Sequence, residues 1–455
     1  MGFFREQLRS ALTESVGQLR VAWLGNFEVE NDWQREGLLS LPSVTSSPSH
    51  RINDSLSELT LMLAEPEDLV LLKHPPDEDY LQYLEEVGWQ APIIVTAEAS
   101  ELPLAEAHLR QRSSKQALRA WAKAGDAYLL PHGVSRQVEK LTRSTNIPLA
   151  AAGEQVSASV NNKLYSRRLC EQTGIRQPHG VAARSLTELQ QGFAEVKRLL
   201  RTSPLLLKEG TGVSGKGIVQ IDNESRFEQI LRLLRRAAEK QGTEQLEMVI
   251  EEKIAKSTDI NYQFLLGRDG TYTPLYTLVA LVDQGKHVGH LHPHQLPAYV
   301  VRQIEESMPL AAEELAGDGY YGMVGVDALL GQDGTLYPCI EINARLNMST
   351  YHVKAFEEWI PPQSAVIARS YSIKRQSPLT FRTLREKLDQ LVFTRKRGSG
   401  ILINAFAPVN ALHQPGHVYT GRLYAMVIGS NRDDCLRLQA QLVKCLRDLG
   451  TVVQG

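Results

Sequence analysis

The deciding segments read Gly322-Met-Val-Gly-Val-Asp327 and, after a glycine-flanked turn, Cys339-Ile-Glu341-Ile-Asn343-Ala-Arg345. They predict two adjacent strands, and in the second strand the polar residues alternate and therefore share one face. Two carboxylates and an amide oxygen are hard ligands that suit Mg²⁺ carrying the phosphates of a nucleotide. Asp327, Glu341 and Asn343 are thus candidate metal ligands, and a hairpin with a polar outer face is the alternative.

A glycine-rich segment lies upstream and reads Leu205-Leu-Leu-Lys208-Glu-Gly210-Thr-Gly212-Val-Ser214-Gly215-Lys216-Gly217-Ile-Val-Gln-Ile221. Residues 210–216 fit the G-x-x-x-x-G-K pattern of a P-loop, but Gly217 stands where a P-loop needs a Ser or Thr hydroxyl. The residues that follow also continue as a strand, whereas a P-loop opens a helix. A glycine-rich turn between two strands predicts a flexible flap whose N–H groups close over phosphates. An ordinary hairpin turn is the alternative.

These segments, together with three others in the same order, resemble the ATP-grasp superfamily. Asn161-Asn-Lys163-Leu-Tyr-Ser-Arg-Arg-Leu is similar to the helix that carries the first nucleotide lysine of the family. Lys208 corresponds to the second lysine, and residues 209–218 correspond to the glycine-rich lid. Met248-Val-Ile-Glu251-Glu-Lys-Ile254 resembles the hinge whose backbone holds adenine. Asp259 falls where the family often places a ribose partner.

The resemblance covers about residues 150–360 and implies a nucleotide site and a metal site. ATP would be the nucleotide, and Mg²⁺, or Mn²⁺ as an alternative, would be held by Asp327, Glu341 and Asn343. The nucleotide-binding residues would be Lys163, Lys208, Gly210, Thr211, Ser214, Gly215, Lys216, Gly217, Glu251, Glu252, Lys253, Ile254 and Asp259.

The resemblance also implies catalytic roles for Lys208, Arg302 and Arg345. Arg345 matches an arginine that often steadies the reacting groups of the family. In the ligases that join D-alanine residues, an arginine lies two positions before the first metal carboxylate, where this chain has Gly325. Arg302 or Arg345 would then stabilise the oxyanion, and the sequence leaves both open.

The segments on either side predict the rest of the fold. Four apolar runs, at residues 20–27, 68–73, 92–96 and 127–131, are consistent with parallel strands of an α/β domain. The predicted fold is α/β and α+β. A pre-ATP-grasp α/β domain at 1–150 precedes a two-lobed ATP-grasp core at 151–375, whose lid-bearing subdomain spans about 185–255. A small C-terminal α+β domain at 376–455 follows, with an amphipathic helix at 433–449.

This order of parts resembles the bacterial peptide ligase of pheganomycin biosynthesis and its relatives. The resemblance implies an ATP-dependent carboxylate–amine ligase that forms a peptide-like bond through an acyl phosphate and releases ADP and phosphate. Its substrates would be an amino-acid or peptide carboxylate and an amine. Two alternatives stay open. One is a ligase that loads an amino acid onto a carrier-protein thiol, or a kinase that stops at phosphate transfer. The other is a non-catalytic nucleotide-binding regulatory protein.

The composition fits a neutral protein of several domains. The chain has 455 residues, of which 22% are charged, and its net charge is −2, which argues against a nucleic-acid partner. No apolar run approaches the roughly 18 residues that a membrane span needs. The four cysteines lie far apart, so we expect free thiols and a cytoplasmic location. A homodimer is the commonest symmetric assembly and fits the resemblance.

Three histidines, His290, His292 and His294, stand at alternate positions and would share a face of an extended strand. Such a set is a potential zinc site. Pro293 disfavours a regular strand, however, and no fourth ligand is close in the sequence. A loop, either beside the active site or on the plain surface, is the favoured interpretation.

Overall fold

The structure is a computed structural model that describes residues 2–15, 17–41, 50–97, 101–212, 217–283 and 286–453. The predicted site residues Ser214, Gly215 and Lys216 lie outside this part of the chain. The described strands form three sheets. No described helix has the length and apolar character needed to cross a membrane. The four cysteines carry free thiols, as predicted.

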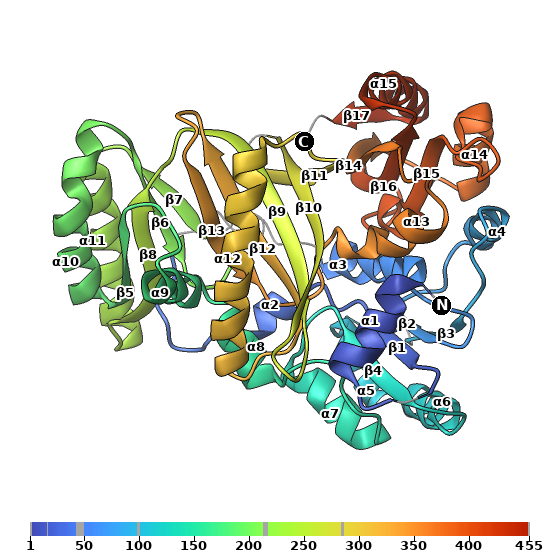
Figure 1. Cartoon of the computed structure of the whole chain (residues 1–455), viewed down its shortest axis with the longest axis horizontal. Helices are drawn as coiled ribbons and strands as arrows, with labels where there is room; N and C mark the ends of the chain where they lie inside the picture. Colours follow the sequence, from blue (N-terminus) through green and yellow to red (C-terminus); the bar gives the residue numbers. More distant parts are fainter. Residues whose placement is uncertain are drawn as a thin grey trace.

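The N-terminal domain is built on a parallel sheet of order β3-β2-β1-β4 (Figure 1). Its strands coincide with the four apolar runs: β1 (Arg20–Leu24), β2 (Leu69–Leu72), β3 (Ile93–Thr96) and β4 (Ala127–Pro131). Parallel strands are usually buried on both faces. Here α5 (Leu104–Arg110), α6 (Arg112–Ala122) and α7 (Arg136–Thr145) cover one face, and η1 (Ser57–Met62) and α1 (Phe3–Leu12) lie against the other. The remaining helices are α2 (Val29–Asp32), α3 (His50–Leu56) and α4 (Glu78–Glu86).

The lid lobe is a smaller layer of antiparallel strands in the order β5-β8-β6-β7. It follows α8 (Glu154–Val160) and α9 (Lys163–Thr173) and comprises β5 (Gly180–Ser185), α10 (Leu186–Val196), η2 (Lys197–Arg201), β6 (Leu205–Glu209), β7 (Ile218–Ile221), α11 (Glu224–Gln241) and β8 (Gln245–Glu252). The pairing of β6 with β7 confirms that the glycine-rich segment joins two strands. Phe193 of α10 and Phe227 of α11 stack against each other in the core under the sheet.

The central sheet contains nine strands in the order β13-β12-β9-β10-β11-β14-β16-β15, with β17 beside β14. Its first elements are β9 (Lys256–Leu266), β10 (Tyr272–Asp283), β11 (Lys286–His292), α12 (Ala298–Gly317), β12 (Gly322–Gly331) and β13 (Leu336–Asn343). Strand residues alternate between faces. Ile260, Tyr262 and Phe264 therefore pack beneath α12, whereas Asn261 and Gln263 point to the opposite face.

The chain beyond residue 375 extends this sheet and forms no sheet of its own within the described residues. After β13 come η3 (Thr350–His352), α13 (Val353–Glu358) and β14 (Ala365–Arg375). The elements beyond residue 375 are α14 (Phe381–Leu388), η4 (Asp389–Leu391), β15 (Gly400–Ala405), η5 (Ala407–Val409), β16 (Tyr419–Gly429), α15 (Arg432–Leu449) and β17 (Thr451–Val453). Strand β14 pairs with β11 on one side and with β16 on the other. The amphipathic helix predicted at 433–449 is confirmed as α15. The predicted domain boundaries stay predictions, and the sheet crosses the one at 375.

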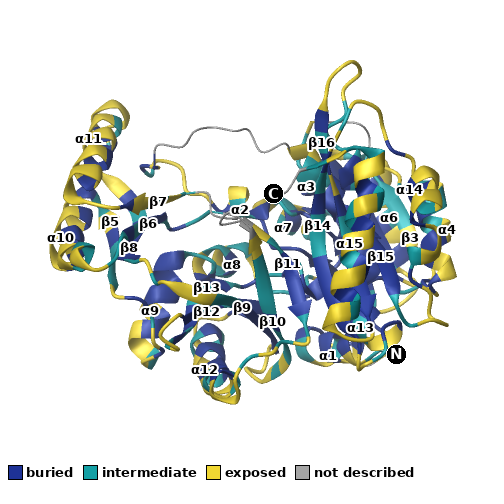
Figure 2. Ribbon diagram, turned by 90° about the horizontal axis from the view of Figure 1, so that it is seen from above, coloured by how far each residue is buried: buried dark blue, intermediate teal, exposed yellow. Residues whose placement is uncertain are grey.

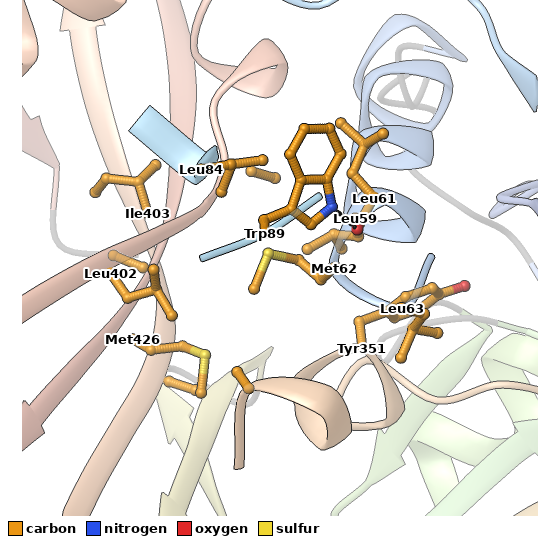
Figure 3. Close-up of a cluster of buried hydrophobic side chains, with 14 of the residues drawn as sticks. Leu59, Leu61, Met62, Leu63, Leu84, Trp89, Tyr351, Leu402, Ile403 and Met426 are labelled. Carbon is orange, nitrogen blue, oxygen red and sulfur yellow. Dashed lines mark hydrogen bonds between the residues drawn. The ribbon is translucent and has the colours of Figure 1, made fainter. Parts of the chain in front are cut away.

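One hydrophobic core joins the N-terminal domain to the C-terminal strands (Figure 3). Figure 3 shows Trp89 beside Leu61, and the Trp89 indole N–H donates to the Leu61 carbonyl at 2.7 Å. Leu402 and Met426 approach from the C-terminal strands. The colouring by burial in Figure 2 shows that this core continues under α15.

A segment of the N-terminal domain, residues 33–41, reaches across to the lid lobe. Leu39 and Leu41 are buried in the lid-lobe core, and the Leu39 N–H donates to the Gln245 carbonyl at 2.8 Å. Arg35 lies 3.0 Å from the carboxylate of Glu247 in β8. The N-terminal domain and the lid lobe therefore share packing as well as a covalent connection.

Glu58 ties the N-terminal domain to the turn after β15. Its carboxylate accepts the N–H groups of Phe406 at 2.5 Å and Ala407 at 2.7 Å. The side chain is buried, and loss of hydration raises the pKa of Glu58 to about 7, although the two N–H donors oppose the shift.

Replacing Glu58 with Gln should make the stability of the chain less sensitive to pH. Folding raises the pKa of Glu58 above the usual 4.5, so the folded state binds this proton more tightly than the unfolded state. The contribution is fully present below the unfolded pKa and is lost as the pH rises through about 7, by about 3 kcal/mol. Thermal unfolding of both proteins from about pH 5 to about pH 8 should show wild type losing stability relative to Glu58→Gln. Parallel curves would contradict this expectation.

Candidate nucleotide and metal site

Asp327 and Glu341 lie directly opposite each other on the antiparallel pair β12–β13. Gly325 faces Asn343 in the same register, so the two carboxylates and the amide share one face. The Asn343 side-chain amide donates to Asp327 Oδ2 at 3.0 Å, and the Asn261 amide donates to Asp327 Oδ1 at 2.9 Å. The structure thus brings the three candidate metal ligands together.

Asp327 lies half-buried next to a second carboxylate, and both circumstances disfavour its negative charge. Loss of hydration and, after it, the neighbouring charge of Glu341 raise the pKa of Asp327 to about 6, although the donors Asn261 and Asn343 oppose the shift. A divalent cation would remove this cost. The atoms of these three side chains that can ligate a metal are carboxylate oxygens and one amide oxygen, so the residues present fit Mg²⁺.

Two cations border the carboxylates. Lys163 begins α9, whose N-cap is Asn162, and its ammonium lies 2.8 Å from Glu341 Oε1 and 3.3 Å from the carbonyl of Gly212. Arg345, just after β13, donates to Asn343 Oδ1 at 3.0 Å and pairs with Glu30 of α2. Positive charge thus reaches the site from both sides.

The second predicted lysine lies at the other end of the site. Lys208 forms an ion pair with Glu251, whose other oxygen is 3.1 Å from Arg167 Nη1. A cavity opens beside this triad, between α9, β8 and β13. Its lining combines cations with apolar side chains, as an adenine nucleotide requires. The lining residues are Lys163, Ser166, Arg167, Gln177, Pro178, Lys208, Val249, Glu251, Cys339 and Ile340.

In the predicted hinge at the end of β8, most backbone N–H groups already have partners and are not free to bind an adenine base. The N–H of Glu252 donates to the His179 carbonyl at 2.8 Å, and that of Lys253 donates to the Pro204 carbonyl at 2.9 Å. Within the described residues the Ile254 N–H has no such partner. Ile254 is therefore the member of the predicted hinge best able to donate to adenine.

The described start of the lid is hydrogen-bonded to β8 and to the first residue of α9. The Gly210 N–H donates to the Glu247 carbonyl at 2.7 Å, and the Gly210 carbonyl accepts the Lys163 N–H at 2.8 Å. Gly217 has a φ of +70°, and a Cβ there would lie 2.4 Å from Glu209 Oε2. Thr211, which follows Gly210, is half-buried. Glycine is thus required at position 217 for both conformation and space.

Asp259 stands two residues before Asn261 on β9 and therefore on the face that carries Asp327. Lys256 is its partner, at 2.7 Å. The structure does not bring Arg302 to this face. That arginine lies exposed on α12, which covers the opposite face of the sheet, because the helix buries Val300 and Ile304 there.

Asn347 occupies the space that an arginine at position 325 would need. A Cβ at Gly325 would lie 2.3 Å from Asn347 Oδ1. The Asn347 amide is itself held by the Arg345 carbonyl at 2.9 Å. Arg345 is therefore the arginine that the structure places beside the metal ligands.

The histidine segment proves to be a strand as far as His292, which corrects the favoured loop interpretation. The strand ends before Pro293, which has no N–H to donate. His290 is buried, and its Nε2 lies 3.1 Å from Nε2 of His287. His294 lies beyond the strand. No group of three or more His, Cys, Asp or Glu side chains that could hold a metal ion occurs among the described residues, so the zinc alternative gains no support.

Sequence reasoning missed three residues of the site: Glu30, Arg167 and Asn261. Two of them had a local signal. Arg167 follows Lys163 by four residues, hence on the same face of α9, and Asn261 alternates with Asp259. Glu30 had none, because it lies 315 positions from Arg345, its partner.

Comparison with known proteins shows which fold this geometry belongs to. The family model of the Pre ATP-grasp domain matches residues 57–147. The N5-carboxyaminoimidazole synthetase of Staphylococcus aureus, solved with ADP, aligns with a TM-score of 0.54 at 11% identity, covering 96% of this chain and 99% of that one. The chain has the ATP-grasp fold. The predicted fold class is thereby confirmed.

Two ligases are also similar to this chain. The butirosin acyl-carrier-protein L-glutamate ligase of Niallia circulans is 23% identical over 436 residues, which cover 95% of this chain and 96% of the relative. The L-amino acid ligase of Bacillus licheniformis aligns with a TM-score of 0.50 at 14% identity, covering 96% of this chain and 99% of that one.

Substituting Glu341 with Gln should weaken Mg²⁺ binding at least about tenfold, the loss typical even of partners outside the metal ligands. Stability without metal should change little, because the side chain is 26% exposed. Calorimetric titration of Mg²⁺ into the ADP-bound chain would measure the affinity. Asp333→Asn is the matched control, since Asp333 lies exposed in the turn of the same hairpin. Unchanged affinity, or a large loss of stability in Glu341→Gln, would count against the assignment.

Substituting Gly217 with Ala should slow ATP turnover by about tenfold or more, because the left-handed conformation costs about 1–2 kcal/mol and Glu209 is displaced. ADP affinity should change far less, since the base is held by the separate hinge. Gly242→Ala is the control: it has a similar φ of +68° at the end of α11, with no atom near its Cβ. Equal effects of both substitutions on turnover would show that the lid end has no special role.

Proposed function

We propose that this chain is an ATP-dependent ligase that activates an amino-acid or peptide carboxylate and joins it to an amine. The observation that carries the proposal is the convergence of Asp327, Glu341 and Asn343 with Lys163 and Arg345 on one face of the central sheet. The cavity that we propose for the nucleotide opens beside it, between α9 and β8.

The proposed chemistry follows from the poor reactivity of a carboxylate. Hydroxide is a poor leaving group, so an amide does not form until the carboxylate is activated. Transfer of the γ-phosphoryl group of ATP gives an acyl phosphate; the amine then attacks the carbonyl carbon, and phosphate leaves. Phosphoryl transfer needs charge neutralisation more than covalent participation of the protein. Bound Mg²⁺ would supply Lewis-acid neutralisation of the phosphate charge.

The residues of this chain have separate tasks in that scheme. Lys163 and Lys208, both largely buried, would bind the phosphates from two directions. Arg345 would bind an oxygen of the substrate carboxylate and later the oxyanion of the tetrahedral intermediate. The lid, once closed, would exclude the water that hydrolyses an acyl phosphate.

A carrier-protein thiol is a second candidate acceptor. The observation that favours it is the name of the relative from Niallia circulans, an acyl-carrier-protein L-glutamate ligase similar over almost its whole length. The likeness to an L-amino acid ligase keeps the amine acceptor first. Both acceptors require the same activated carboxylate, so they differ only in the second half of the reaction.

The proposal is tested by incubating the pure chain with ATP, Mg²⁺ and single amino acids, with hydroxylamine in place of the acceptor. An acyl phosphate reacts with hydroxylamine to give a hydroxamate, so hydroxamate should accumulate in equal amounts with ADP. The Arg345→Ala variant should form little hydroxamate. Release of AMP and pyrophosphate would contradict the phosphoryl mechanism, and a stable phosphorylated amino acid would indicate a kinase. Adding an amine or a thiol-bearing carrier protein then distinguishes the two acceptors.

A further inference from the structure

Glu30 is the one described residue of the N-terminal domain that forms an ion pair inside the candidate site. Its Oε1 accepts Arg345 Nε at 2.8 Å and also pairs with Nη2. Both side chains are about nine-tenths buried, at 14% and 13% exposed. Sheltered charge-assisted contacts of this kind are strong, whereas exposed ones contribute little.

The helix that carries Glu30 is itself held firmly. Val29 is fully buried and packs against Gly133 after β4. Trp33, one residue past the end of α2, donates its indole N–H to the Val134 carbonyl at 2.8 Å. The Glu30 carboxylate is therefore presented to Arg345 from a rigid support, as a residue that orients another must be.

The donors of Arg345 are nearly all in use. A guanidinium has five N–H groups. The Nε–H and one Nη2–H meet Glu30, the other Nη2–H meets Asn343 Oδ1, and one Nη1–H meets the Leu346 carbonyl at 3.1 Å. Among the residues that the structure describes, none accepts the second N–H on Nη1, which is left for a ligand. Arg345 is thus arranged to contact a single oxygen and not to clamp a carboxylate with two parallel bonds.

Charge explains why a further carboxylate is needed. The carboxylates that act on Arg345 are Glu30, Glu341 and Asp327. The last two are candidate metal ligands, so binding of a divalent cation would withdraw their compensation from the arginine. Glu30 is the member of this group that keeps its charge available for Arg345 when the metal site fills.

We propose that Glu30 is a positioning residue: it holds the Arg345 guanidinium so that its remaining N–H meets one oxygen of the substrate carboxylate. The inference rests on the proposed ligase function for the identity of that oxygen. It assigns the N-terminal domain a direct part in setting the geometry of the reacting groups. Glu30 itself touches no substrate in this arrangement.

A double-mutant cycle tests the inference. Glu30→Gln should lower kcat/KM for the amino acid about tenfold, the equivalent of one lost orienting contact of about 1.4 kcal/mol. The KM for ATP should stay within about twofold, because the nucleotide is held elsewhere. In an Arg345→Ala background, Glu30→Gln should have no further effect. Glu36→Gln, an exposed carboxylate six positions away, is the control and should behave as wild type.

Two results of the cycle would overturn the inference. Equal losses in both backgrounds would mean that Glu30 acts independently of Arg345. A lower KM for the amino acid in Glu30→Gln would mean that Glu30 occupies the place of the substrate carboxylate and blocks it.

A measurement that requires no turnover, hydrogen exchange on the free chain, tests this inference separately from the proposed function. The Leu346 N–H donates to the His132 carbonyl at 2.9 Å, and Arg345 holds the Leu346 carbonyl. If Glu30 fixes Arg345, hydrogen exchange at residues 345–347 of the free chain should be faster in Glu30→Gln and unchanged in Glu36→Gln. Unchanged exchange in Glu30→Gln would overturn the positioning role. A wild-type chain that forms no hydroxamate would refute the ligase proposal, and the exchange result would still decide the role of Glu30.

Discussion

The register between β12 and β13 is the constraint on which the site depends, because it sets Asp327 directly against Glu341. Two carboxylates this close repel each other unless cations approach, and the surrounding elements supply them. Helix α9 starts with Lys163, and the chain leaves β13 through Arg345. Each of these cations is paired with a carboxylate in turn, so the site is a charge-balanced network that a metal ion and a polyphosphate can enter.

A second cluster of charged side chains balances a buried carboxylate with cations on the lid side of the site. Glu251 lies between Lys208 and Arg167, which come from β6 and α9. Helix α9 therefore contributes to both clusters and fixes the distance between them. The segment with Leu39 and Leu41 adds a further link, since it ties the N-terminal domain to the lid-lobe core. The lid lobe is consequently held to both the N-terminal domain and α9.

Side chains of the central sheet also support the segment that follows the candidate metal ligands. Gln263, fully buried on β9, donates to Asn261 Oδ1 and accepts the Thr350 hydroxyl, both at 2.9 Å. These contacts hold the segment after β13 across the sheet, and Tyr351 fastens it to His132 of the N-terminal domain at 2.9 Å. The shared core around Trp89 and Met426 then makes the C-terminal strands part of the same support.

Local pattern alone determined the strands and the candidate ligands of this protein. Period-two alternation in residues 339–345, the four apolar runs and the amphipathic helix at 433–449 depend on neighbours in the chain, so the sequence was sufficient. The tertiary structure alone decided which strands pair and that β14 joins β11. It also decided that Arg302 lies exposed on α12, away from the site, and that Glu30 meets Arg345. The physical reason is that strand pairing and ion pairs are decided by packing between segments far apart in the sequence. The residues next to a strand or a charged side chain in the sequence do not indicate which distant partner it will meet.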